Sequence, residues 1–513
     1  MSTHCTMTNG QAVPIQSIPH VHWKDFSDWI LAECASGAHV CSFFGLPEKE
    51  LPPPARLPGT MKGKIRIFAI LARANEATLG VASSSAAHAY PSLTPLLPSL
   101  HLFERNLHEK YGLVPQGHPW LKPVRFPHAE GPRAGDMEFF SVGGDEVHEV
   151  AVGPIHAGII ECGHFRFQCL GETVMHLEIS LGYHHRGIEQ ALTGGPGKNT
   201  FPVMETLAGD TSVGHAWAAC GVVEALADCA VAPRGQLLRA IALELERLAN
   251  HTGDLGALAG DVGFLPTASY CGRIRGDFLN MTAALCGNRF GRGLVRPGGT
   301  AFDLDGPLAL DLAERVRKAH RDVRGAAALL FNSTSVTARM MGIGTLSRQA
   351  ASDMGMVGPA ARASNLRLDA RVTHPLPHLR GHDLHICTEP SGDVQARAMV
   401  RMREISESAA FVSRLLGHLP EGESMAAPFG PSRPAHEVML APLSFGLALV
   451  EGWRGEICHA ALTDNAGHFC HYAVTDPSFH NWAGLALALR DQEISDFPLC
   501  NKSFNLSYCG HDL

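Results

Sequence analysis

Cysteine is the residue type in this sequence with the most direct potential for metal or redox chemistry, because thiolates bind zinc, iron–sulfur clusters and nickel. The chain has 513 residues and 14 cysteines, and no two of them form a Cys-x-x-Cys pair. The nearest pairs, Cys34/Cys41 and Cys162/Cys169, are seven residues apart. This spacing argues against a zinc ribbon, a thioredoxin-type redox pair and the common ferredoxin clusters.

Other chemical motifs are weak. His468, Cys470 and His471 could contribute to a metal site, but zinc needs three or four convergent ligands and no second group is near in sequence, so packing or surface roles are the alternative. The loop 194–200 has a Gly-Lys pair without the earlier glycine and the following Ser/Thr of a phosphate-binding loop. No Gly-x-Gly-x-x-Gly follows a predicted strand, so we expect no nicotinamide site.

Composition narrows the class of protein. A net charge of −8 with 18% charged residues disfavours a nucleic-acid-binding protein. The N-terminal residues carry neither a basic start nor an apolar run of signal-peptide length, and no stretch approaches the ~18 apolar residues of a membrane span. We therefore expect a cytoplasmic protein, peripheral on the inner face of the cell membrane, with reduced thiols that act mostly as small buried groups.

The first part of the chain has the periodicity of a small α/β domain. Apolar spacing predicts a helix over 23–34 and a second one that ends at Gly112. Short β-rich segments predict strands, and a Pro/Gly-rich stretch over 126–144 indicates a connection. We place a loose tail at 1–20, this domain at 21–135 and a linker at 136–148. The predicted strands are 39–46, 64–72 and 76–84.

The rest of the chain is mostly helical. Strands are predicted over 146–152 and 165–170, and residues 443–450 fit a buried element. Amphipathic or small-residue-rich patterns predict four helices. The fold class is therefore α+β, with a small N-terminal α/β domain and a large, mainly helical second domain containing small β pieces. The predicted helices are 214–231, 236–254, 310–330 and 393–416.

Residues 103–119 contain an amphipathic helix, a stop at Gly112 and a Gly117-His118-Pro119 loop. In order and type they resemble the signature of the 30 kDa subunit of respiratory complex I. An unrelated helix followed by a tight loop is the alternative.

Six segments of the second domain resemble the large subunits shared by complex I, where it is the 49 kDa subunit, and membrane-bound nickel–iron hydrogenases. Order and spacing hold over roughly 149–513. Nearly the whole chain thus resembles a fused 30 kDa/49 kDa protein of the formate hydrogenlyase and hydrogenase-4 large-subunit type. The segments are 153–167, 181–189, 244–251, 357–364, 392–401 and 495–499.

The resemblance implies where hydrogenases of this family carry four metal-binding cysteines. Here those positions hold Ala208, Thr211, Leu506 and Cys509. A nickel–iron centre is held and bridged by soft thiolates, so one cysteine is insufficient and we expect this chain to bind no such metal. Other pocket positions do match: Glu161 stands where the family has a proton-transferring glutamate, and Arg454 where an arginine lines the metal. A buried ion pair kept for packing is the alternative for both.

The resemblance to the complex I subunit implies a quinone site with a histidine, a tyrosine and an aspartate. The histidine position falls on Cys162 and the tyrosine position on Gly209, and only the aspartate has a counterpart, Asp261. The groups that would polarise a quinone are thus replaced.

Four neighbouring side chains could serve as proton donors instead, since carboxylate–histidine neighbours can titrate near neutral pH. His156 lies in the same opening motif and is a further candidate for binding a cofactor. The four donors are Glu161, His164, Asp210 and His215.

Two functions remain open. The first is the large subunit of a complex I-like oxidoreductase, which passes electrons from a cluster in an iron–sulfur small subunit to a quinone-like acceptor and attaches to the membrane through antiporter-like and other membrane subunits. The second is a structural or conformational-coupling subunit without chemistry. An active nickel–iron hydrogenase conflicts with the single thiolate. The electron donor is not defined by this sequence.

Overall fold

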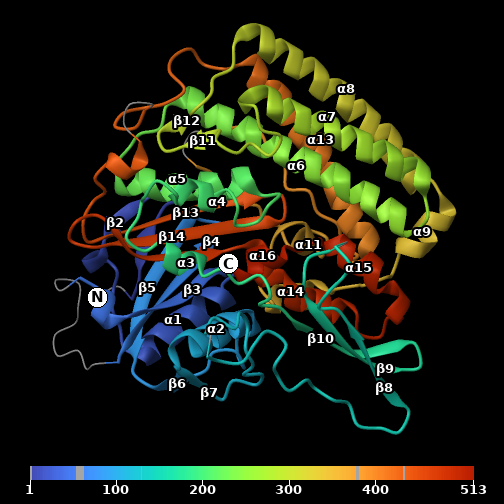
Figure 1. The fold of residues 1–513 in the computed structure, drawn as a ribbon, viewed down its shortest axis with the longest axis horizontal. Helices are drawn as coiled ribbons and strands as arrows, with labels where there is room; N and C mark the ends of the chain where they lie inside the picture. Colours follow the sequence, from blue (N-terminus) through green and yellow to red (C-terminus); the bar gives the residue numbers. More distant parts are fainter. Residues whose placement is uncertain (1–2, 53–62, 129, 159, 377–380, 431–433) are drawn as a thin grey trace.

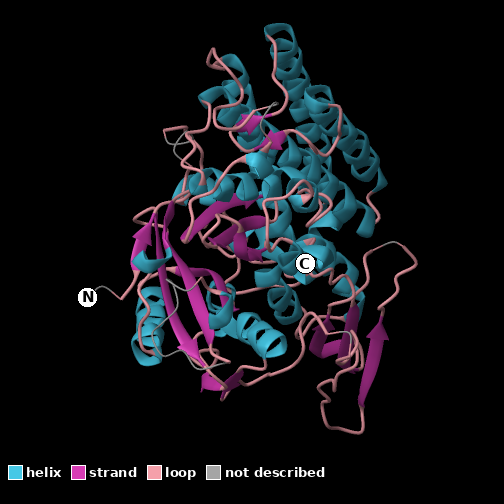
Figure 2. Ribbon diagram, turned by 60° about the vertical axis from the view of Figure 1, so that its left-hand side comes forward, coloured by secondary structure: helices cyan, strands magenta, loops and turns pink. Residues whose placement is uncertain are grey.

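The computed structural model describes residues 3–52, 63–128, 130–158, 160–376, 381–430 and 434–513. Its fold is α+β, as the sequence predicts. Two four-stranded sheets lie against each other in one half of the molecule, and long helices fill the other half (Figures 1 and 2). A separate three-stranded sheet lies at the edge (Figure 1).

The N-terminal sheet has the strand order β1-β5-β4-β3 with antiparallel pairing throughout. The predicted strands and both predicted helices are present, and α2 ends where Gly112 takes a left-handed conformation (φ 68°) that disfavours side chains with a Cβ. The elements are β1 Cys5–Met7, α1 Trp23–Ala35, β3 His39–Pro47, β4 Ile65–Arg73, β5 Thr78–Ala86, β6 Ala89–Pro91, α2 His101–Tyr111 and β7 Val114–Gln116.

The strand β4 shows why this sheet is apolar on both faces. Ile67 and Leu71 point into a core shared with α1 and α2, and Phe68 and Ile70 point into a core shared with the second sheet. Successive side chains of a strand alternate between faces, so burial of both faces produces the nearly continuous apolar sequence of this segment.

The second sheet has the order β15-β14-β13-β2 and is also antiparallel. The Phe68 and Phe445 rings stack at 6.3 Å between centroids where the two sheets meet. On the opposite face, α5 approaches closely because Gly221 faces Ala448, and a Cβ added there would lie 3.0 Å from the alanine side chain. The strands are β2 Ala12–Pro14, β13 Ser444–Gly452, β14 Gly455–Thr463 and β15 Phe469–Thr475.

Residues 3–20 are not a loose tail, which corrects the prediction. β1 pairs with β5 of the first sheet, and β2 pairs with β13 of the second. Each strand has only three residues, so its stability comes from pairing with distant strands and from packing, which leave no periodic pattern in the local sequence.

Helix α5 packs on the face of the second sheet that points away from the first sheet, and the longest helix, α6, packs against α7 and α13. The predicted helices at 214–231, 236–254, 310–330 and 393–416 correspond to α5, α6, α8 and α13. The helices of this domain are α3 Ile188–Ala191, α4 Thr200–Met204, α5 Ser212–Leu226, α6 Pro233–Asp261, α7 Leu265–Cys286, α8 Gly306–Phe331, α9 Thr334–Met340, α10 Arg348–Asp353, α11 Gly358–Arg362, α12 Ala370–Thr373, α13 Val394–Gly417, α14 Pro477–Ala488, α15 Phe497–Phe504 and α16 Tyr508–Asp512.

The three-stranded sheet has the order β10-β9-β8 and packs on the C-terminal helices through Phe165, Phe167 and Phe497. Among the described residues, no helix combines the length and the apolar composition needed to cross a bilayer. The remaining strands are β8 Val147–Val152, β9 His164–Leu170, β10 Thr173–Ser180, β11 Val295–Arg296 and β12 Gly299–Thr300.

Candidate functional site

Three distant segments of the chain meet at Cys509, at the beginning of α16. The Cys509 sulfur lies 3.2 Å from Oε1 of Glu161, which comes from the loop before β9. The backbone N–H of Gly209, from the loop before α5, also interacts with this sulfur. Burial and the Glu161 carboxylate raise the pKa of the Cys509 thiol. The structure therefore brings the glutamate position and the remaining thiol position of the family together.

Arg454 holds two of these segments. It lies in the two-residue turn between β13 and β14, and its guanidinium contacts both carboxylate oxygens of Asp210 at 2.5 and 2.8 Å. The same group donates to the Asn505 carbonyl at 2.5 Å and to the Thr211 hydroxyl at 3.2 Å. Close packing fixes the turn, because a Cβ on Gly358 would lie 1.9 Å from the Arg454 carbonyl oxygen.

Asp210 is an ionised partner of Arg454 in this arrangement. Burial opposes ionisation, but the Arg454 charge and its hydrogen bonds outweigh that effect and lower the pKa of Asp210. The Asp210 carbonyl also accepts hydrogen bonds from Trp453 Nε1 and Asn250 Nδ2, each at 3.0 Å. Asp210 is thus a poor proton donor at neutral pH and a good positioning group.

We call this group of residues the Cys509 site: Glu161, Gly209, Asp210, Thr211, Arg454 and Cys509. Of the other family metal positions, Ala208 is fully buried and Leu506 packs in the apolar cluster around Tyr508. The four positions supply one thiol, one hydroxyl and two aliphatic groups, which do not fit a nickel–iron centre.

Arg454 and Glu161 lie in different surroundings. Arg454 is buried and forms an ion pair with Asp210, the arrangement that the packing alternative describes. Glu161 is exposed and contacts a thiol, so it forms no buried ion pair. The functional roles of both residues stay predictions.

The loop that carries Glu161 and Cys162 is fixed by histidines. His156 Nε2 lies 2.8 Å from the Gly163 carbonyl oxygen, and His164 Nδ1 lies 3.4 Å from that of Gly153. Burial is the main cause of a lowered pKa at His164. The Cys162 N–H donates to His184 Nε2 at 3.0 Å. These contacts give His156 and His164 positioning roles in the loop.

His215 lies in a separate buried chain of polar groups. Its Nε2 is 3.0 Å from Asp476 Oδ2 and its Nδ1 is 3.1 Å from His459 Nε2. His459 Nδ1 then lies 3.0 Å from the Tyr472 hydroxyl. Burial lowers the pKa of His459 well below its usual range. Asp261, at the end of α6, pairs instead with Lys502 at 2.6 Å.

Glu246 is a candidate that the sequence interpretation missed. Its carboxylate accepts hydrogen bonds from the Val213 and Gly214 N–H groups at 2.8 and 3.3 Å, and it lines a small cavity together with Asp210 and Asn250. Burial is the main cause that raises the pKa of Glu246 to about 8, and the Asp210 charge adds to it. An acidic residue among the apolar positions of a long helix was the only sequence signal.

A second charge cluster lies deeper in the helical body, and we call it the Arg362 network. Arg362 contacts Glu404 and Glu451, each at 2.7 Å. Arg371 contacts Asp369 at 2.6 Å and Glu244 at 3.0 Å. The full set is Glu244, Arg247, His251, Arg362, Asp369, Arg371, Glu404 and Glu451, all buried.

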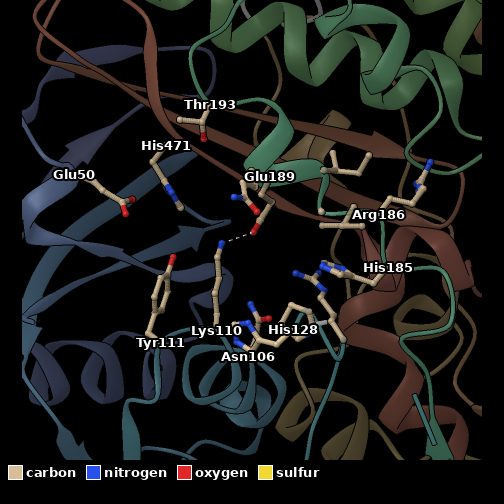
Figure 3. A pocket seen from close by; sticks show the side chains of 16 residues that line it. Glu50, Asn106, Lys110, Tyr111, His128, His185, Arg186, Glu189, Thr193 and His471 are labelled. Carbon is tan, nitrogen blue, oxygen red and sulfur yellow. Dashed lines mark hydrogen bonds and ion pairs between the residues drawn. The ribbon is translucent and has the colours of Figure 1, made fainter. Parts of the chain in front are cut away.

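The cavity in Figure 3, of about 510 Å³, lies between the two domains and includes none of the Cys509 site residues. Lys110 of α2 forms an ion pair with Glu189 at 3.1 Å (Figure 3). Burial opposes the charge of Glu189, but Lys110 and Arg125 lower its pKa to about 2. Glu189, from the matched segment 181–189, therefore connects the second domain to the first.

Comparisons with known proteins support the resemblance. Residues 261–512 match the family described as respiratory-chain NADH dehydrogenase, 49 Kd subunit, and residues 54–131 match the 30 Kd subunit family. Formate hydrogenlyase subunit 5 of Escherichia coli (strain K12) is 29% identical over 441 residues, which are 82% of this chain and 76% of that protein. Hydrogenase-4 component G of the same organism is 28% identical over 440 residues, 82% of this chain and 75% of that protein.

A solved structure has the same fold. It is that of a membrane-bound sulfane sulfur reductase, described as an archaeal respiratory membrane complex, with a TM-score of 0.66 and 21% identity. The match covers 72% of this chain and 99% of the other.

Proposed function

Because the chain belongs to the complex I family, as a fusion of 30 kDa- and 49 kDa-subunit domains, we propose that it is the large subunit of a membrane-associated oxidoreductase complex. It passes electrons from an iron–sulfur partner subunit to a quinone-like acceptor at the Cys509 site, without a nickel–iron centre. Its relatives named above belong to formate hydrogenlyase and hydrogenase-4. Membrane attachment then comes through other subunits.

The observation that carries this proposal is the contact between Cys509 and Glu161. A nickel–iron centre needs four thiolates, and a two-electron reduction of a quinone needs two protons but no metal at the same place. The site keeps an exposed carboxylate and loses three thiolates, so it is suited to proton transfer and unsuited to nickel.

Three side chains have separate roles in the proposed proton transfer. Glu161 is the exposed group that transfers a proton to a bound acceptor. Glu246, with a pKa of about 8, is protonated at neutral pH and can resupply protons from behind Asp210. Arg454 keeps Asp210 ionised and joins the loop before α5 to the loop before α16.

The test uses the purified complex. We expect no stoichiometric nickel and reduction of a quinone analogue that falls in Glu161→Gln and Glu246→Gln variants. Glu172→Gln, an exposed carboxylate in the β9–β10 turn, is the matched control and should leave turnover unchanged. Stoichiometric nickel, or undiminished turnover in both variants, would overturn the proposal.

The alternative is a structural or coupling subunit without chemistry. The buried chain from Asp476 through His215 to Tyr472 favours it, because these groups are satisfied by one another and are closed to an acceptor. In that case a His215→Gln variant lowers the yield of assembled complex, and the assembled fraction shows no acceptor reduction in any variant.

A further inference from the structure

A compact group of ligating side chains lies where the two sheets meet, outside the six matched segments of the sequence and outside the Cys509 site. His39 and Cys41 lie on β3 of the N-terminal sheet, and Glu456 lies on β14 of the second sheet. One ligating atom from each residue lies within 4.8 Å of the others. In the described parts of the chain, these residues are the group of three potential metal ligands whose ligating atoms all lie within 4.8 Å of one another.

The distances between these atoms match those between ligands around one tetrahedral metal ion. His39 Nε2 lies 3.1 Å from both carboxylate oxygens of Glu456, and the Cys41 sulfur lies 3.7 Å from the same nitrogen. Zinc bonds of about 2.0–2.3 Å at tetrahedral angles place neighbouring ligands about 3.3–3.6 Å apart. Small side-chain movements are therefore sufficient to bind an ion.

Without a metal, His39 pairs with the Glu456 carboxylate and the Cys41 thiol donates to the same carboxylate. A metal ion would replace these donated hydrogens, because imidazole, thiolate and carboxylate all bind metals through lone pairs. Cys41 and Glu456 are buried, at 0% and 5% exposure, so the three ligating groups meet away from bulk water.

We propose that His39, Cys41 and Glu456 bind one Zn²⁺ ion that joins the two domains. A mixed nitrogen, sulfur and oxygen set suits zinc, whereas Mg²⁺ and Ca²⁺ prefer oxygen ligands. His480 interacts with the Cys41 carbonyl and helps to hold the ligand strand in place. The site does not depend on the proposed function.

Zinc at this position would act as a cross-link. Its ligands come from residues 39–41 and 456, which are far apart in the sequence, and it would clamp β3 to β14 across the shared apolar core. Ligands that meet only in the folded chain couple metal binding to folding, so bound zinc stabilises the assembled pair of sheets.

The first experiment measures zinc binding to the full chain after removal of metals, by competition with a chromophoric chelator. We expect one tight site per chain and a higher midpoint of thermal unfolding with zinc. Cys41→Ala should weaken binding by at least about 100-fold, because even changes next to metal ligands cost 10–100-fold. Cys458→Ala is the matched control, since Cys458 is a buried thiol on β14 beside Cys41 but outside the group of three.

A second measurement covers the case in which Cys41→Ala fails to fold. Co²⁺ substituted into the unaltered chain should give the absorption of a thiolate–cobalt bond, and His39→Gln should remove it while the chain stays folded. Sub-stoichiometric zinc, equal binding by Cys41→Ala and the control, or an unchanged cobalt spectrum in His39→Gln would each show adventitious binding only and would overturn the proposal.

Discussion

The Arg362 network and the Cys509 site each include residues of the matched segments, such as Arg362 and Glu161, yet they differ in exposure and in charge balance. The network is closed: its eight side chains are buried and its guanidinium groups each contact a carboxylate. The Cys509 site contains an exposed carboxylate beside a thiol. The matched segments therefore contribute both to a closed charge cluster and to a partly exposed group of side chains.

The Arg362 network also contains an unequal number of positive and negative groups. The network has four carboxylates and three guanidinium groups. Burial is the main cause that raises the pKa of Glu451 to about 7, although Arg362 opposes it. Burial lowers the pKa of His251 to about 4, despite its contact with Glu404. A proton bound at Glu451 thus offsets the surplus negative charge of the network.

The largest expected effect is in the network. Arg362→Met removes the partner of Glu404 and Glu451 and should destabilise the chain by about 3–5 kcal/mol, because it leaves buried carboxylates without compensation. Urea unfolding of the full chain measures this. Arg273→Met, at an exposed ion pair with Asp277, is the control and should cost less than about 1 kcal/mol. Equal losses in both variants would contradict the contrast between the regions.

The second effect is the pH dependence at Glu246. Its pKa of about 8 in the folded chain exceeds its ordinary value of 4.5, so the folded state binds a proton that the unfolded state lacks between these values. This contribution to stability is present below about pH 4.5 and is lost as pH rises to 8, with a maximal slope of about 1.4 kcal/mol per pH unit. Glu246→Gln should therefore gain stability relative to the unaltered chain as pH rises. Parallel stability profiles would contradict this.

The third effect is smaller. Asp210→Asn keeps the shape of the side chain but removes its charge beside buried Arg454, which retains the Asn505 carbonyl as an acceptor. A loss of about 1–3 kcal/mol is expected. Thermal unfolding measures it, and Asp303→Asn, at an exposed pair with Arg234, is the control. No loss would show that Arg454 is held by backbone contacts alone.

The smallest effect on stability is at Glu161. Glu161→Gln should change stability by less than about 0.5 kcal/mol because the side chain is exposed. It should nevertheless speed alkylation of Cys509 severalfold, since the Glu161 carboxylate helps to raise the pKa of this thiol. Peptide mass spectrometry measures the rate, with Glu172→Gln as control. An unchanged alkylation rate would show that Glu161 does not affect the Cys509 thiol.

The sequence predicted elements with strong local patterns. The helix that ends at Gly112 and the strand around Phe68 were placed within a residue or two, and the family resemblance is confirmed. Helix α7 was missed because Pro266, Gly272 and Gly276 interrupt its pattern, although a proline in the first turn is well tolerated. Short strands such as β2 depend on partners far away in the sequence.

From the sequence, the Cys509 site was predicted only as a set of positions. Motif order located Glu161, Arg454 and Cys509, but the pairing of Arg454 with Asp210 and the raised pKa of Glu246 arise from contacts between distant segments. The catalytic roles of the site residues and the domain boundaries remain predictions. The local sequence does not show which buried carboxylate lies beside a positively charged side chain in the folded chain.

The pairing of β2 with β13 gives the polypeptide an interleaved topology. Residues 12–14 precede the first domain in the sequence but complete the edge of a sheet built from residues 444–475. A chain cut in the 136–148 connection would therefore leave β13 with unpaired backbone groups along one side, and open strand edges promote association with other chains. The two halves should be produced together, since the N-terminal half supplies an edge strand of the sheet in the other half.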